Sequence, residues 1–150
     1  MKTIFDQSTR DEMIRRIVCL GADSKAIWGS MTVFQMLRHC TLWEETILQN
    51  KTHPRPLIGR LIGPMILRSV LKDDSPLRRN SPTIPAFRIR ENTGDVETEK
   101  TRWIALIGDY GRYALPDHSF IHSFFGRMTR EQIGYLVYKH GHHHLSQFGC

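Results

Sequence analysis

The sequence predicts an all-α fold, a four-helix bundle with long crossover connections. Three observations support this class: the helical spacing of apolar residues, the capping residues and the lack of strand alternation. Four segments place apolar residues at the spacing of an amphipathic helix, and their starts carry recognisable capping residues. No long window shows the alternation of apolar and polar residues that is typical of a strand. A chain of 150 residues fits one domain of ordinary size, so we treat residues 1–150 as a single domain.

The first two helices are predicted from their start signals. Thr9-Arg10-Asp11-Glu12 has the pattern of a capping box, and Gly21 provides a stop for the helix that follows it. The second helix opens at Ser30 or Thr32 and runs to about Asn50. Its buried face is expected to consist of Val33, Met36, Leu37, Cys40, Trp43 and Ile47.

The central connection is dominated by proline and by one apolar stretch. Prolines at positions 54, 56, 76, 82 and 85 exclude a long regular element. Glycine, proline and arginine interrupt the apolar stretch Leu57–Leu71, which is also shorter than the ~18 residues of a membrane span. We interpret it as a buried or pocket-lining segment that is helical in parts, and we expect no membrane partner.

The remaining two helices carry clear boundaries. Asp95 can cap a third helix, and Pro116 ends it. Its apolar face holds Trp103, Leu106, Ile107 and Tyr110. Residues 117–128 form an aromatic loop, and Thr129-Arg130-Glu131-Gln132 is a second capping box that starts the final helix.

Composition limits the range of functions. The net charge is +6, but the basic residues are scattered and no nucleic-acid-binding motif is present, so we expect no nucleic acid partner. The three cysteines form no Cys-x-x-Cys pair and are expected to be reduced. The segment Met1–Arg10 lacks the apolar core of a signal peptide, so a cytoplasmic location is expected.

The most informative feature is a cluster of histidines in the final helix. His140 and His144 are four residues apart, so both imidazoles point the same way and can share one metal ion. They continue the register of Ile133, Leu136 and Val137, which places them on the face that the helix buries. His142 and His143 point elsewhere, and at most one of them is expected to join the site.

A third ligand is needed, and His39 supplies it. His39 lies at the border of the buried stripe of the second helix, so that with His140 and His144 it would form a three-histidine site with positions open for water or substrate. Gln147, one turn beyond His144, is placed to orient an imidazole or is simply a helix-ending glutamine. His122 is a candidate proton carrier or gate, or else a structural anchor of the aromatic loop.

This order of histidines resembles the DinB/YfiT-like superfamily of metal-dependent bundle proteins. The segments that carry the resemblance are Trp28–Thr32 with Gln35–His39, and the terminal His-x-x-x-His-x-x-Gln pattern from His140 to Gln147. The loop His122-Ser-Phe-Phe-Gly126 and the Gln147-Phe148-Gly149 ending are similar to an uncharacterised branch, a domain of unknown function. The likeness covers nearly the whole chain, and residues 72–93 are its least diagnostic part.

The resemblance implies a four-helix bundle that forms a homodimer and binds a divalent metal, zinc or nickel first and manganese or iron next. It also implies a small-molecule substrate, with a low-molecular-weight thiol as a candidate. The function expected is therefore that of a metal-dependent enzyme, such as a thiol-dependent S-transferase or isomerase. A metal-dependent hydrolase and a non-catalytic metal-binding or stress-response bundle stay open as alternatives.

Overall fold

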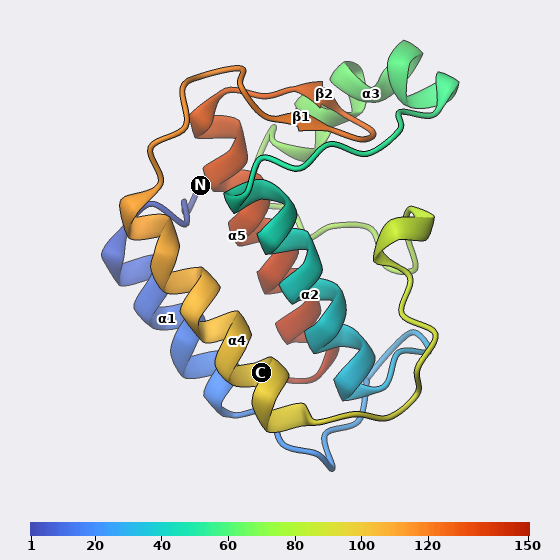
Figure 1. Cartoon of the computed structure of the whole chain (residues 1–150), viewed down its shortest axis with the longest axis vertical. Coiled ribbons are helices and arrows are strands. Elements are labelled where there is room, and N and C mark those ends of the chain that lie inside the picture. Colours follow the sequence, from blue (N-terminus) through green and yellow to red (C-terminus); the bar gives the residue numbers. More distant parts are fainter.

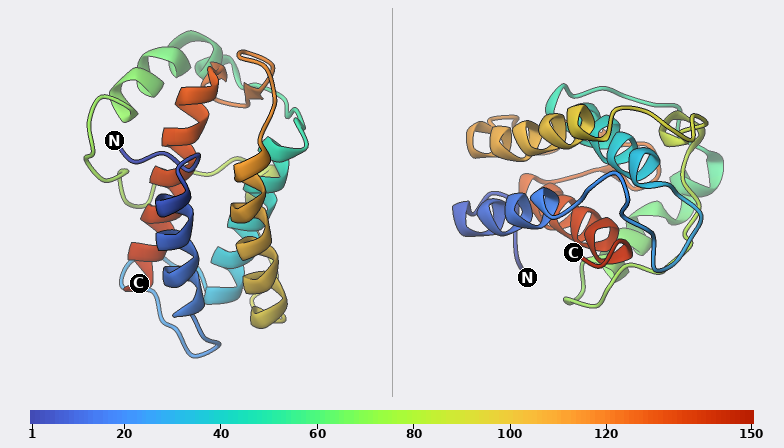
Figure 2. Two further views of the ribbon diagram at one scale, coloured as in Figure 1. Left: turned by 90° about the vertical axis from the view of Figure 1, so that its left-hand side faces the viewer. Right: turned by 90° about the horizontal axis from the view of Figure 1, so that it is seen from below.

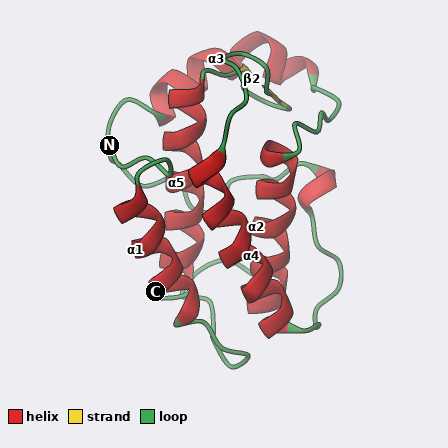
Figure 3. Cartoon of the chain, turned by 60° about the vertical axis from the view of Figure 1, so that its left-hand side comes forward, coloured by secondary structure: helices red, strands yellow, loops and turns green.

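The protein is mostly helical, as the sequence predicts. The computed structural model describes all of residues 1–150 (Figure 3). In chain order its elements are α1 (Gln7–Val18), α2 (Val33–Leu48), α3 (Leu57–Val70), η1 (Pro85–Phe87), α4 (Val96–Asp109), η2 (Tyr110–Arg112), β1 (Ile121–His122), β2 (Gly126–Arg127) and α5 (Arg130–Gln147). Both η elements are short 3-10 helices.

Four of the helices lie side by side and enclose the core. α2 and α4 run in one direction and α1 and α5 in the other (Figure 1). α1 and α2 each contact both α4 and α5, so apolar faces meet in the middle. The buried core there includes Met13, Ile17, Trp103, Ile107 and Val137. α3 stands apart, at one end of these helices beside the β1–β2 hairpin (Figure 2).

Three predicted helix starts are confirmed. The Thr32 hydroxyl accepts from the Gln35 amide at 3.2 Å, while the Gln35 side chain accepts from the Thr32 amide at 3.0 Å. Thr129 and Gln132 make the same reciprocal pair at the start of α5. Asp95 accepts from the backbone of residue 98 and caps α4. Each cap satisfies amide groups that have no partner within the helix.

The predicted start of the first helix is wrong. α1 begins at Gln7, so Thr9 lies inside the helix and is buried. The Arg10 guanidinium donates to the carbonyl groups of Ile4 and Phe5, at 3.0 and 2.7 Å. These bonds hold the preceding segment against the first turn, so a tertiary contact sets the boundary earlier than the capping-box pattern does.

The interpretation of Leu57–Leu71 is also wrong. The segment is one continuous helix with Pro64 inside it, and four of its large apolar side chains, Leu57, Ile58, Leu61 and Met65, are exposed. Only Gly59, Gly63 and Leu67 are buried. Two of the three buried residues are therefore glycines, which apolar content alone does not indicate.

Two smaller differences concern residues 110–128. α4 gives way to the 3-10 helix η2 at Tyr110 instead of continuing to Pro116. The aromatic loop contains the antiparallel hairpin, in which His122 pairs with Gly126. Among all the helices of the protein, none is both long enough and apolar enough to cross a membrane.

Candidate metal centre

Three histidines meet between α2 and α5. The Nε2 atoms of His39 and His140 are 3.1 Å apart. The ring of His144 is centred 4.9 Å from that of His39 and 4.7 Å from that of His140. One nitrogen atom from each residue lies within 4.8 Å of the other two. The fold thus brings together the three predicted ligands, two from one helix and one from another.

Hydrogen bonds set the tautomers of two of these rings. His39 Nδ1 lies 2.9 Å from the Phe87 carbonyl oxygen, and His144 Nδ1 lies 3.0 Å from Gln147 Oε1. Because carbonyl oxygens only accept, each Nδ1 carries the proton and each Nε2 keeps its lone pair. The Gln147 amide is itself oriented, since its Nε2 donates to the Trp28 carbonyl at 2.9 Å. This is the outer support that histidine ligands of metals commonly have.

His140 is held by packing instead. Its ring stacks on Trp43, with centroids 4.3 Å apart and planes inclined by 24°. Its Nδ1 is buried without a hydrogen-bond partner, which is uncommon for a polar atom in a folded protein. The ring is therefore placed by its stacking on Trp43 and by the contact of its Nε2 with His39 Nε2, and Nδ1 stays unpaired.

The separation of two of the three nitrogens suits a divalent ion. A tetrahedral ion with nitrogen ligands at about 2.0–2.1 Å separates those nitrogens by about 3.3–3.4 Å. The two Nε2 atoms of His39 and His140, 3.1 Å apart, lie close to that separation. Imidazole nitrogens are ligands that zinc, nickel, copper and iron accept. The three histidines could therefore hold a metal ion.

The electrostatics of the cluster keep the imidazoles neutral. Burial lowers the pKa of His144 to about 3, with a further contribution from the neighbouring His39. Burial also holds the pKa of His140 well below its usual range and lowers the pKa of His39. Neutral rings at neutral pH retain the lone pairs that a metal needs, so no proton has to leave before binding.

His122 anchors the aromatic loop. Its Nδ1 accepts from the backbone amides of Phe124 and Phe125, at 3.1 and 3.2 Å, so Nε2 carries the proton. The ring stacks on Phe125 and meets Trp43 edge-on, with centroids 4.5 and 6.5 Å away. Burial, with the nearby Arg55 guanidinium, lowers its pKa to about 4. These contacts favour the anchoring interpretation, and they link the loop through Trp43 to the His140 ring.

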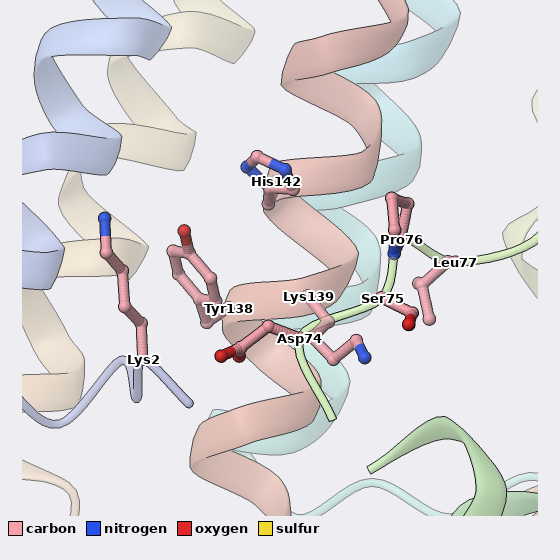
Figure 4. A pocket seen from close by; sticks show the side chains of 8 residues that line it. All are labelled: Lys2, Asp74, Ser75, Pro76, Leu77, Tyr138, Lys139 and His142. Atoms are coloured by element: carbon pink, nitrogen blue, oxygen red, sulfur yellow. The ribbon is translucent and has the colours of Figure 1, made fainter. Parts of the chain in front are cut away.

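The other two histidines of α5 lie outside the cluster. His142 Nδ1 accepts from Arg16 at 2.8 Å, and its ring stacks on Tyr138. His143 packs edge-on against Trp28. A surface hollow of about 210 Å³ opens beside His142 (Figure 4), and its lining includes none of the three clustered histidines. Its residues are Lys2, Asp74, Ser75, Pro76, Leu77, Tyr138, Lys139 and His142.

Sequence reasoning missed two parts of the centre and one buried acid. Trp43, one turn after His39, was assigned to the core, although its position on the same helix face pointed to the centre. The Phe87 carbonyl lies in the proline-rich connection, where no residue type marks it. Glu44 is fully buried on the α4 side of α2, where the Tyr110 hydroxyl donates to it at 2.5 Å. Burial raises the Glu44 pKa to about 8.

The family comparison agrees with one part of the predicted resemblance. A family model described as "Protein of unknown function (DUF1569)" matches residues 4–149. No curated protein and no solved structure matches the chain. The expected membership in a domain of unknown function is confirmed, while the wider relationship to the DinB/YfiT-like superfamily stays a prediction.

Proposed function

The chain belongs to the DUF1569 family, whose function is unknown, and we propose from the geometry of its histidine cluster that it is a divalent-metal-dependent enzyme. His39, His140 and His144 would hold the ion. Zinc or nickel is the first expectation, because both suit neutral imidazole ligands, and manganese or iron is the second. In the same proposal the four packed helices form a four-helix bundle of the DinB/YfiT kind.

One observation carries the proposal. His39 donates a hydrogen bond to the Phe87 carbonyl, and His144 donates one to Gln147 Oε1. Both protons are on Nδ1, so the Nε2 atoms of these two rings are unprotonated and keep their lone pairs. A histidine that serves only the core normally has both ring nitrogens paired, whereas His140 Nδ1 is buried without a partner. Here the second nitrogen of His39 faces another imidazole, at 3.1 Å from His140 Nε2. An ion shared by these histidines would account for the arrangement.

The proposed chemistry follows from the donor set. When bound, the ion supplies Lewis-acid chemistry and lowers the pKa of a thiol or water molecule beside it. We favour a transfer or isomerisation in which a low-molecular-weight thiol acts on a small-molecule substrate. Hydrolysis by water is the second choice. A thiolate is already nucleophilic and needs no separate general base. Phe87 and Gln147 fix the ligand rings, and His122 holds the aromatic loop beside Trp43.

Metal content is the decisive experiment. Untagged protein, His144→Ala and the matched control His142→Ala would be compared by inductively coupled plasma mass spectrometry after loading with each candidate metal. We expect about one ion per chain in the unmodified protein and in His142→Ala, and none in His144→Ala, since three ligands hold one ion. Protein that cannot be loaded with zinc, nickel, manganese or iron would refute the proposal.

A structural ion is the second candidate function. The burial of His39 and His144, which are 4% and 7% exposed, favours it. The variant His39→Ala separates the two functions. If the ion is catalytic, the variant should lose metal and keep most of its thermal stability. If the ion is structural, the variant should unfold at a much lower temperature, because metal binding is then part of the folding free energy.

A further inference from the structure

Helix α3 presents its large apolar side chains to the surroundings. Leu61 is 82% exposed, and Leu57, Ile58 and Met65 are also exposed. Leu57, Leu61 and Met65 are four residues apart, so they form one stripe along the helix. A contiguous apolar patch of this kind marks an interaction surface, whereas single exposed apolar residues do not.

The opposite side of α3 fixes this orientation. A Cβ atom on Gly63 would lie 2.1 Å from the Phe124 carbonyl oxygen, and one on Gly59 would lie 2.9 Å from the same atom. The helix therefore rests on the hairpin loop through its glycines, at a distance that no larger residue allows. Lys139 donates to the carbonyl of Val70 at 2.7 Å and holds the end of the helix. The apolar stripe cannot turn inward without breaking these contacts.

The charges on α3 and on the segment before it are of one sign, and the nearest acids in the sequence after the helix are Asp73 and Asp74. Residues 46–72 contain no aspartate or glutamate. Their five basic residues are Lys51, Arg55, Arg60, Arg68 and Lys72. Arg60 and Arg68 lie on α3 itself and are exposed. Exposed cations beside an apolar stripe attract an anionic occupant. A second copy packed α3 against α3 would instead bring like charges together, with no carboxylate on the helix to pair them.

We propose that α3 is an interfacial helix that lies in the plane of an anionic lipid surface. A helix of 14 residues is about 21 Å long, and this one sits at an end of the molecule, where a flat surface can reach it (Figure 1). Its apolar side chains protrude as a ridge, which acyl chains can surround. Arginine stems extend along such a ridge while their charges stay at the headgroups.

This contact is compatible with the absence of a spanning helix. The sequence-based expectation of no membrane partner rested on the length that a crossing requires, and a helix that lies in the interface has no such requirement. Binding through one short helix is reversible, so this contact would let the protein exchange between the surface and free solution. The proposal does not depend on the metal centre.

Vesicle co-sedimentation tests the proposal. Full-length protein would be mixed with phosphatidylcholine vesicles and with vesicles that also contain about 30% phosphatidylglycerol. We expect at least about tenfold tighter binding to the anionic vesicles, weakened by added salt. The double variant Leu61→Ser/Met65→Ser should lose about tenfold or more of the affinity. Arg60→Gln should lose about fivefold, the effect of one charge near such a surface.

The matched control is Val18→Ser, which removes an exposed apolar residue from α1, 57% exposed, and should bind like the unmodified protein. Circular dichroism melts would show that each variant folds. The proposal is overturned if no vesicle binds the protein or if the double variant binds as well as the unmodified chain. It is also overturned if sedimentation equilibrium shows a dimer that the double variant abolishes while vesicles bind neither, because the stripe would then contact a second copy.

Discussion

Replacing Glu44 by glutamine is expected to flatten the pH dependence of stability. Glu44 is buried between α2 and α4, and burial raises its pKa from 4.5 to about 8, against the opposing effect of the Tyr110 hydrogen bond. In the folded protein the carboxyl group is therefore neutral at pH 7. A buried acid with a raised pKa is also a common mark of a catalytic site, so the test separates a core role from a catalytic one.

The direction of the pH dependence follows from the Glu44 pKa in the unfolded chain and in the folded protein. Below about pH 4.5 the carboxyl is protonated in both the folded and the unfolded chain. Above it the unfolded chain releases the proton and the folded chain does not, so the free energy of unfolding falls as the pH rises to about 8. At about 1.36 kcal/mol per pH unit, the loss between pH 5 and pH 7 is about 3 kcal/mol.

The assay is urea denaturation of the unmodified chain and of Glu44→Gln, followed by circular dichroism at several pH values. The difference between their unfolding free energies should change by about 3 kcal/mol between pH 5 and pH 7. The buried histidines, whose pKa values are lowered, destabilise both proteins in acid and cancel in this difference. Glu44→Gln should keep its bound metal, because Glu44 is not part of the histidine cluster. Parallel pH profiles would show that Glu44 is ionised in the folded state, and loss of metal would place it in the centre.

Four further variants test the centre, the position of α3 and the start of α5. Gln147→Leu removes the amide that orients one ligand ring and should lower zinc affinity about 10- to 100-fold, measured by chelator competition; unchanged affinity would contradict the role of this hydrogen bond. Gly63→Ala places Cβ 2.1 Å from the Phe124 carbonyl oxygen and should cost about 1–3 kcal/mol in chemical denaturation. Gly108→Ala, whose Cβ meets nothing within 4 Å, should instead stabilise by up to about 1 kcal/mol; equal effects would argue against the tight contact under α3. Thr129→Ala should cost about 1 kcal/mol in thermal unfolding, and an unchanged melting temperature would contradict the capping box.

Local signals in the sequence determined much of the helical pattern. The starts at Thr32, Asp95 and Thr129 were predictable because a cap is formed by residues within one turn of each other. The pairing of His140 with His144 was predictable for a similar reason, since residues four apart share one helix face. These features depend on local spacing, and tertiary packing left them unaltered, whereas it overrode the same signal at Thr9.

Tertiary structure decided how the centre is supported. The Phe87 carbonyl that fixes the tautomer of His39 belongs to a connection 48 residues away along the chain. Every residue has a backbone carbonyl, so no residue type in the sequence marks the one that the fold brings to His39. The stacking of Trp43 on His140 likewise requires α2 and α5 to be neighbours, which neither helix encodes by itself.

Tertiary structure also decided which apolar residues are buried. The sequence shows that Leu57–Leu71 is apolar, and that property alone favours a place in the core. The hairpin accepts only the glycine side of α3, because the Phe124 carbonyl leaves no room for a larger side chain at Gly63. Close contact with Phe124, far along the chain, thus turned the apolar stripe outward. The start of α1 at Gln7 likewise depends on a tertiary feature, the contacts of Arg10.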